Sequence, residues 1–187
     1  MKIEKRIELM KDKIKEKDFL DSKGLGNEVA FWIFDYPAEK ELLIRDTIHK
    51  IKTNFEKQSI YILEIDLYNL CLGILQEKIS FERITDFEKK KGSNELLNKL
   101  KPILKPEVFR DAILTKMDDT VDLVFLTGVG KVWPLVRSHA ILNNLQSVIT
   151  DVPLVMFYPG NYSGFDLSLF GKFKDTNYYR AFRLIND

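Results

Sequence analysis

The sequence has a single cysteine, two histidines and a formal net charge of only +1 over 187 residues. Because one cysteine cannot close an internal disulfide, we expect a cytoplasmic protein. Two histidines without a pair of cysteines are too few ligands for a zinc site. A net charge this close to zero argues against the broad basic surface that non-specific DNA binding requires, so we expect no direct binding to nucleic acid.

Long hydrophobic runs are also missing. No apolar run approaches the roughly 18 residues that a membrane-spanning helix needs, and the charged N-terminus does not resemble a signal peptide, so we expect no contact with a membrane. Apolar residues nevertheless make up 45% of the chain and aromatic residues 12%, which argues against intrinsic disorder. The length predicts one folded domain over residues 1–187.

Hydrophobic patterning predicts an α/β fold. Short apolar runs, typical of strands buried on both faces of a parallel sheet, lie at residues 29–34, 60–65, 121–126 and 152–158, and residues 178–185 alternate like a fifth strand. Helical segments are predicted between them at 39–55, 67–75 and 134–148. This strand–helix repetition predicts a mostly parallel sheet flanked by helices, Rossmann-like or P-loop-like in arrangement but without a Walker A motif.

Two further helical regions lie outside this repeat. Residues 1–20 form an amphipathic pattern with a narrow apolar stripe, which consists of Ile3, Ile7, Met10 and Ile14. The stripe fits a helix that lies along its own domain, and it also fits an arm for docking or for homodimerisation. Residues 81–119 predict an inserted helical segment that is interrupted at Gly92, Pro102 and Pro106.

Polar residues and glycines follow the predicted strands at their carboxyl ends, which is the edge where parallel sheets bind ligands. These residues are Asp35, Asp66, Gly128, Gly130, Lys131, Tyr158 and Gly160. Residues 123–150 contain no acidic side chain, and Arg137 and His139 add positive charge there, which favours an anion. We therefore predict a ligand pocket for an anion or a nucleotide. The alternative is the ordinary loop polarity of any α/β protein.

Catalytic patterns find little support. The stretch GVGK at 128–131 is not a Walker A motif, because Val132 stands where a magnesium-binding Ser or Thr is required. Ser138 and His139 are adjacent, so their side chains diverge on a helix and cannot act as a dyad. Cys71 lies in an apolar run and is expected to pack in the core. We predict no catalytic residue, no cofactor and no metal site, although Asp35 and Asp66 would be the ligands if magnesium bound.

The C-terminal stretch mixes aromatic residues with arginines, a composition that is enriched at protein interfaces. We predict partner contacts by Tyr178, Tyr179, Arg180 and Arg183. The alternative is an edge strand with packed aromatic rings and solvated arginines.

Five motifs together resemble the BrxB family, the small B protein of bacterial BREX phage-defence systems. They are GLGN (24–27) followed by IFDYP (33–37); EIDLY (64–68); LTGVG (126–130) followed by Pro134 and RSH (137–139); FYPGNY (157–162) with LFG (169–171); and NYYRAF (177–182). The resemblance implies a component of a multi-protein defence complex, with other BREX proteins as partners and the phosphatase-like PglZ component foremost among them. It implies no catalytic activity, so we expect a non-catalytic interaction or scaffold protein.

Overall fold

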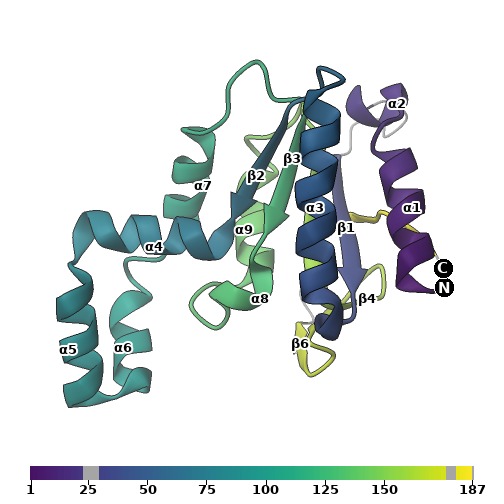
Figure 1. Ribbon diagram of the computed structural model, residues 1–187. Coiled ribbons are helices and arrows are strands. Elements are labelled where there is room, and N and C mark those ends of the chain that lie inside the picture. The colour runs from purple at the N-terminus through teal and green to yellow at the C-terminus, as the bar shows by residue number, and fades with distance from the viewer. Residues whose placement is uncertain (23–29, 176–179, 187) are drawn as a thin grey trace.

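A largely parallel sheet forms the centre of the molecule (Figure 1). The computed structural model describes residues 1–22, 30–175 and 180–186. The strands are β1 (Phe31–Tyr36), β2 (Ile62–Asp66), β3 (Leu123–Thr127), β4 (Leu154–Tyr162), β5 (Leu167–Leu169), β6 (Phe173–Asp175) and β7 (Phe182–Arg183). Their order is β2-β3-β4-β1-β7, and every neighbouring pair on this path is parallel. The predicted α/β class with a mostly parallel sheet is confirmed.

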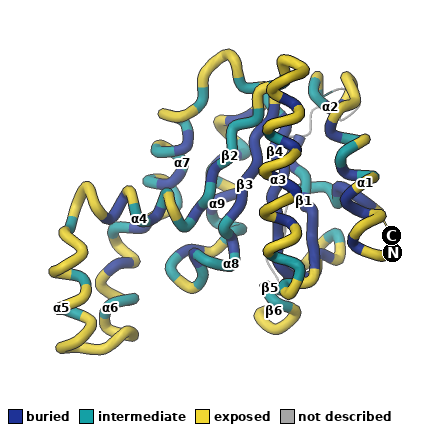
Figure 2. Tube along the Cα trace, viewed as in Figure 1, coloured by how far each residue is buried: buried dark blue, intermediate teal, exposed yellow. Residues whose placement is uncertain are grey.

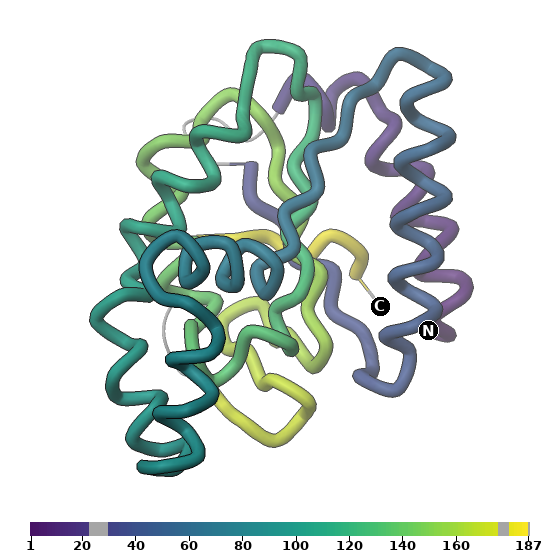
Figure 3. The backbone as a smooth tube through the Cα atoms, turned by 60° about the vertical axis from the view of Figure 1, so that its left-hand side comes forward, coloured from purple at the N-terminus to yellow at the C-terminus, as the bar shows by residue number. Residues whose placement is uncertain are grey.

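Helices cover both faces of the sheet. They are α1 (Ile3–Lys13), α2 (Lys17–Leu20), a 3-10 turn (Ala38–Lys40), α3 (Glu41–Glu56), α4 (Leu67–Lys78), α5 (Phe81–Lys91), α6 (Ser93–Leu100), α7 (Pro106–Leu114), α8 (Val129–Val132) and α9 (Ser138–Leu145). One apolar cluster joins α1 and α3 to one face of the sheet, and a second joins α4, α7, α8 and α9 to the other. Helices α5 and α6 lie away from the sheet in both views (Figures 1 and 3).

Side-chain alternation along the strands builds these two cores. In β1, Phe31 and Ile33 belong to the α9 side, whereas Trp32 and Phe34 face α1 and α3. Strands β1, β3 and β4 are dark along most of their length in Figure 2, while the outer faces of the helices are exposed. Burying an aromatic or branched side chain of this kind stabilises the fold by about 1.5–3 kcal/mol.

The apolar stripe of the N-terminal helix is buried in this chain's own core. Ile3, Ile7, Met10 and Ile14 belong to the cluster that contains Phe34. The helix therefore lies along its own domain, as one of the two sequence-based alternatives has it. The homodimer stays a prediction, and its contact would have to use other residues.

Four predicted elements differ from the structure. The predicted helix over residues 1–20 is interrupted, because α1 ends at Lys13 and α2 begins at Lys17. The predicted strand 152–158 continues to Tyr162, because β4 leaves β1 and pairs antiparallel with β5. The predicted helix 134–148 is shorter, since Arg137 is extended and α9 begins only at Ser138. Within residues 180–185, the described part of the predicted C-terminal strand, the strand is β7, two residues that pair with β1.

The inserted segment 81–119 forms three helices. Gly92 separates α5 from α6 and has a φ of 85°. Pro106 is the first residue of α7, a position whose main-chain N–H forms no hydrogen bond within the helix, so a proline costs none there. None of the helices in residues 1–22, 30–175 and 180–186 is both long and hydrophobic enough to cross a bilayer.

Candidate functional site

The predicted strand-end residues do not share one pocket. Successive side chains of a strand point to opposite faces of the sheet, so residues that meet at one edge are sorted onto two sides. Asp66 at the end of β2 and Thr127 at the end of β3 open toward α3, whereas Tyr158 of β4 belongs to the core on the α9 side. The single pocket expected at this edge is therefore a wrong prediction, and the structure has a separate polar pocket on each side.

The pocket on the α3 side, here called the strand-end cleft, has a volume of about 210 Å³. It contains Asp66, Gly128 and Lys131 of the predicted set. Asp66 caps α4 by accepting hydrogen bonds from the main-chain N–H groups of Tyr68 (3.0 Å) and Asn69 (3.1 Å), and it forms an ion pair with Lys131. Both charged groups are thus engaged with each other.

Sequence reasoning missed the other polar residues of the strand-end cleft. The Tyr36 hydroxyl donates to Glu41 Oε2 (2.6 Å), and Arg45 Nε donates to Glu41 Oε1 (2.7 Å). Burial, assisted by the Glu41 carboxylate, raises the pKa of Tyr36 well above its usual range. The four-residue spacing of Glu41 and Arg45 on a helix was the signal for this pair.

The third carboxylate of the cleft, Glu64, is also matched by this chain's own groups. Lys52 Nζ donates to Glu64 Oε2 at 2.8 Å, and the Thr127 hydroxyl donates to Oε1 at 3.2 Å. Within the part of the chain that the structure describes, no cluster of three or more His, Cys, Asp or Glu side chains could hold a metal ion. The strand-end cleft is therefore a network of internally paired charges.

The predicted glycines fill positions where a side chain would collide. Gly128 has a φ of 73°, and a Cβ atom there would lie 2.4 Å from Asp66 Oδ1. At Gly130 it would lie 2.9 Å from a ring carbon of Phe170, and at Gly160 only 2.1 Å from the main-chain oxygen of Ser168. Close packing accounts for these glycines, and ligand binding by them stays a prediction.

Asp35 lines neither polar pocket. It is 5% exposed and lies beneath α1, where Arg6 Nη2 donates to its Oδ1 at 2.5 Å. The main-chain N–H of Tyr162 donates to Oδ2 at 2.9 Å, and Arg183 Nη2 is 3.6 Å from the same oxygen. The carboxylate therefore ties α1, β1, β4 and β7 together.

The second polar pocket, here called the aromatic pocket, lies between the α8–α9 connection and the β5–β6 hairpin and has a volume of about 330 Å³. Its lining residues are Trp133, Arg137, Ser138, Tyr158, Leu169, Lys172, Phe173, Lys174 and Asp175. It brings the predicted Arg137 and Tyr158 together. The predicted His139 lies beside it and binds Asp175, with Nδ1 and Oδ2 2.7 Å apart.

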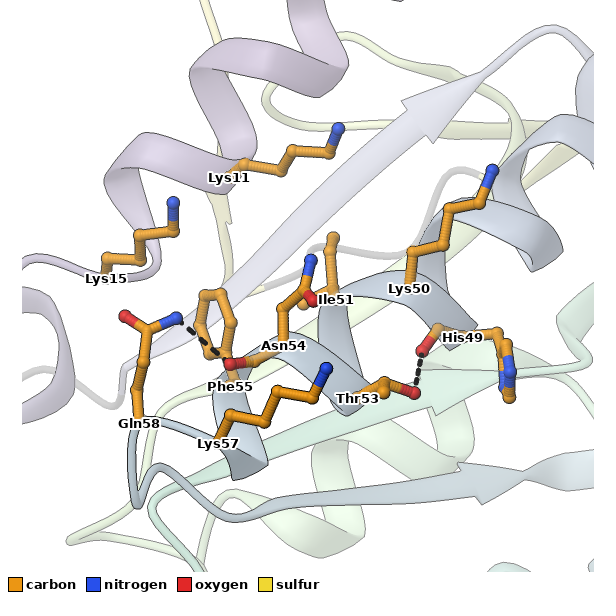
Figure 4. Close-up of a pocket in the computed structure, with 10 residues that line it drawn as sticks. All are labelled: Lys11, Lys15, His49, Lys50, Ile51, Thr53, Asn54, Phe55, Lys57 and Gln58. Carbon is orange, nitrogen blue, oxygen red and sulfur yellow. Dashed lines mark hydrogen bonds between the residues drawn. The ribbon is translucent and has the colours of Figure 1, made fainter.

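A positively charged groove was not predicted from the sequence. A groove of about 570 Å³ lies between α1 and α3 and is here called the basic groove (Figure 4). Its lining residues are Lys11, Lys15, His49, Lys50, Ile51, Thr53, Asn54, Phe55, Lys57 and Gln58, with no carboxylate among these described residues. Figure 4 shows lysines reaching into the groove from both helices, with Phe55 between them.

Of the predicted partner-binding residues, Tyr178 and Tyr179 lie outside the described residues. Arg180 is exposed, and its main-chain oxygen accepts a hydrogen bond from Gln146 Nε2 at 2.8 Å. Arg183 lies against Asp35, so it takes part in the fold as well.

Cys71 is expected to be unreactive in the folded protein. Its side chain is fully buried, and burial raises the pKa of the thiol to about 11. Because only the thiolate attacks disulfide reagents, native protein at neutral pH should react at least about 100-fold more slowly than free cysteine. A colorimetric thiol titration with and without urea measures this, and prompt reaction of the native protein would contradict it.

These features define an α/β protein with a central parallel sheet. The charged groups at the edge of the sheet are mostly paired within the chain, and the basic groove and the aromatic pocket are two positively charged surfaces.

Comparison with known proteins identifies the family. The family profile "BREX protein BrxB" matches residues 63–184. A BREX protein BrxB of Bacillus cereus (strain H3081.97) is 46% identical over 189 residues, which cover 99% of this chain and 98% of the relative. One of Escherichia coli O9:H4 (strain HS) is 40% identical over 186 residues, 99% of this chain and 92% of the relative. No solved structure matches the chain.

The chain therefore belongs to the BrxB family, and the resemblance carried by the five motifs is confirmed. Membership makes it a component of a BREX system, with a role in phage defence.

Proposed function

We propose that this protein is a non-catalytic interaction component of a BREX defence complex, which docks the phosphatase-like PglZ component through the basic groove. The observation that carries the proposal is a preformed concave surface of one charge sign in a protein whose net charge is only +1. Such a local concentration of charge favours a partner surface of opposite sign and speeds the encounter with it.

The lysines of the basic groove are available for a partner. Lys15 and Lys57 have no ion-pair partner among the described residues, and the Lys15 ammonium lies 6.0 Å from the centre of the Phe55 ring. Lys11 pairs with Glu8 and Lys50 with Asp46, but both pairs are exposed. Exposed pairs contribute about 0–1 kcal/mol, so carboxylates of a partner can replace them at little cost.

The arrangement of the other candidate groups supports an interaction role over a chemical one. The carboxylates of the strand-end cleft are engaged by Arg45, Lys52 and Lys131. The buried Cys71 thiol has a raised pKa and is a poor nucleophile. The basic groove is therefore the surface that a partner with an acidic segment fits best.

Charge reversal in the basic groove should weaken the complex. The double variant Lys15→Glu/Lys57→Glu should bind purified PglZ component at least about 10-fold more weakly than the unchanged chain, because it replaces two attractive contacts by repulsive ones. Binding is measured by titration calorimetry at two salt concentrations. The matched control is Lys89→Glu/Lys90→Glu on the exposed face of α5, which changes the net charge equally.

The outcome separates the surface from the net charge. The control should bind like the unchanged chain, and circular dichroism should show that both variants are folded. Equal weakening by both variants, or no weakening by either, would remove the basic groove from the proposal. Absence of any complex between the two purified proteins would overturn the docking role itself.

A further inference from the structure

The aromatic pocket carries unbalanced positive charge. Arg137, Lys172 and Lys174 line it, and none of the three has an ion-pair partner among the residues that the structure describes. Asp175 is the acidic residue of the lining, and its carboxylate is engaged with His139. The pocket thus offers cations without their own counter-ions, unlike the strand-end cleft.

The hydroxyl of a largely buried tyrosine also opens into this pocket without a hydrogen-bond partner among the described residues. Tyr158 is 2% exposed, lines the pocket and makes no hydrogen bond through its hydroxyl to any described residue. The hydroxyl oxygen itself is not enclosed, because it does not belong to the fully buried side-chain atoms that lack a partner within the described part of the chain. It therefore opens into the pocket, where a ligand can accept its hydrogen bond. Burial and the nearby Asp175 raise the pKa of Tyr158, so the hydroxyl keeps its proton and can donate it to an anion.

The start of α9 adds to the attraction for negative charge. Ser138, the first residue of α9, lines the pocket, and the preceding Arg137 does not cap the helix with its side chain. The uncapped N-terminus of a helix presents free N–H groups and the positive end of the helix dipole. Three different elements therefore offer donors to one anionic group.

One wall of the pocket is flat and apolar. The rings of Trp133 and Phe173 are 4.2 Å apart between centroids with an angle of 31° between their planes. Phe173 is 43% exposed, so a ring of the ligand can stack on its free side. The volume of about 330 Å³ lies at the lower end of the range for small-molecule pockets.

We propose that the aromatic pocket binds a small nucleotide, with its phosphoryl group against Arg137, Lys172 and the Tyr158 hydroxyl and its base on Phe173. The site lies on the opposite face of the sheet from the basic groove, so it is independent of partner docking. Its test uses the purified full-length chain alone and leaves the docking proposal unaffected.

Calorimetric titration with three probes tests the assignment: inorganic phosphate, ribose 5-phosphate and adenosine monophosphate. Adenosine monophosphate should bind at least about 10-fold more tightly than the other two, because only it carries a ring for Phe173. Equal affinity for the three probes would overturn the nucleotide assignment. No heat from any probe at millimolar concentration would overturn the site.

Two variants test the residues. Arg137→Gln and Tyr158→Phe should each weaken binding of adenosine monophosphate by about 10-fold, because each removes a donor to a charged group. The matched control Tyr162→Phe removes a tyrosine hydroxyl that is already hydrogen-bonded within the chain, to the main-chain oxygens of Gly164 (2.9 Å) and Ala181 (2.8 Å).

Stability separates binding from folding in these variants. Tyr162→Phe should lower the melting temperature and leave the affinity unchanged, whereas Tyr158→Phe should lower the affinity and leave the melting temperature unchanged or raised. Unchanged affinity in both Arg137→Gln and Tyr158→Phe would overturn the site.

Discussion

Replacement of Asp35 by alanine is expected to destabilise the folded protein by about 3–5 kcal/mol. Its carboxylate is buried together with the Arg6 guanidinium, and loss of one member of a buried ion pair is strongly destabilising because the other charge stays buried without this counter-ion. The main-chain N–H of Tyr162 would lose its acceptor as well. Urea unfolding followed by circular dichroism measures the change.

Two comparisons define the origin of this loss. Asp46→Ala breaks the exposed pair with Lys50 and should cost less than about 1 kcal/mol. In the double variant Arg6→Met/Asp35→Ala both charges of the buried pair are removed. Its loss of stability should therefore be smaller than the sum of the losses in the two single variants. A cost for Asp35→Ala as small as that for Asp46→Ala would show that the buried pair does not hold α1 on the sheet.

Gly160→Ala is expected to cost about 2–4 kcal/mol, although it adds only one methyl group. The new Cβ would lie 2.1 Å from the main-chain oxygen of Ser168, and neither atom belongs to a flexible side chain that could move aside. Relief requires separation of β4 from β5, where Gly160 pairs with Leu169. Hydrogen exchange at β5 should therefore accelerate together with the loss of stability.

Gly73 provides the matched control. It lies within α4, and a Cβ atom there would meet nothing within 4 Å. Gly73→Ala should stabilise the protein by about 0.5–1 kcal/mol, because alanine favours the helical backbone over glycine. Equal effects of the two substitutions in urea unfolding would mean that the approach of β5 to Gly160 is not tight in solution.

Hydrophobic runs in the sequence were sufficient to predict the four longest strands of the sheet and their parallel pairing. Helix boundaries were less accessible, because the extended conformation of Arg137 is set by the turn after α8 and has no marker in the sequence. The continuation of β4 beyond Tyr158 depends on β5, a strand of three residues that a hydrophobic pattern cannot distinguish from a loop.

The candidate site shows a similar division. The carboxyl ends of the parallel strands lie at one edge of the sheet, as the sequence predicts. Because side chains alternate along a strand, however, Asp66 and Tyr158 lie on opposite faces of the sheet. Lys172 and Phe173 reach the aromatic pocket only because the β5–β6 hairpin returns beside Trp133. The residues on each side of the basic groove are spaced as on a helix. The groove exists, however, only because α1 and α3 lie next to each other, which no local pattern predicts.

The position of β1 determines when the fold can form during translation. β1 lies between β4 and β7, and its Phe31 pairs with Leu154. The N-terminal segment therefore leaves the ribosome long before its neighbours in the sheet have been synthesised, and the nascent chain exposes the isoleucines of α1 until β4 emerges. Chains truncated ahead of β4 should consequently be captured by chaperones or degraded rather than accumulate as folded fragments.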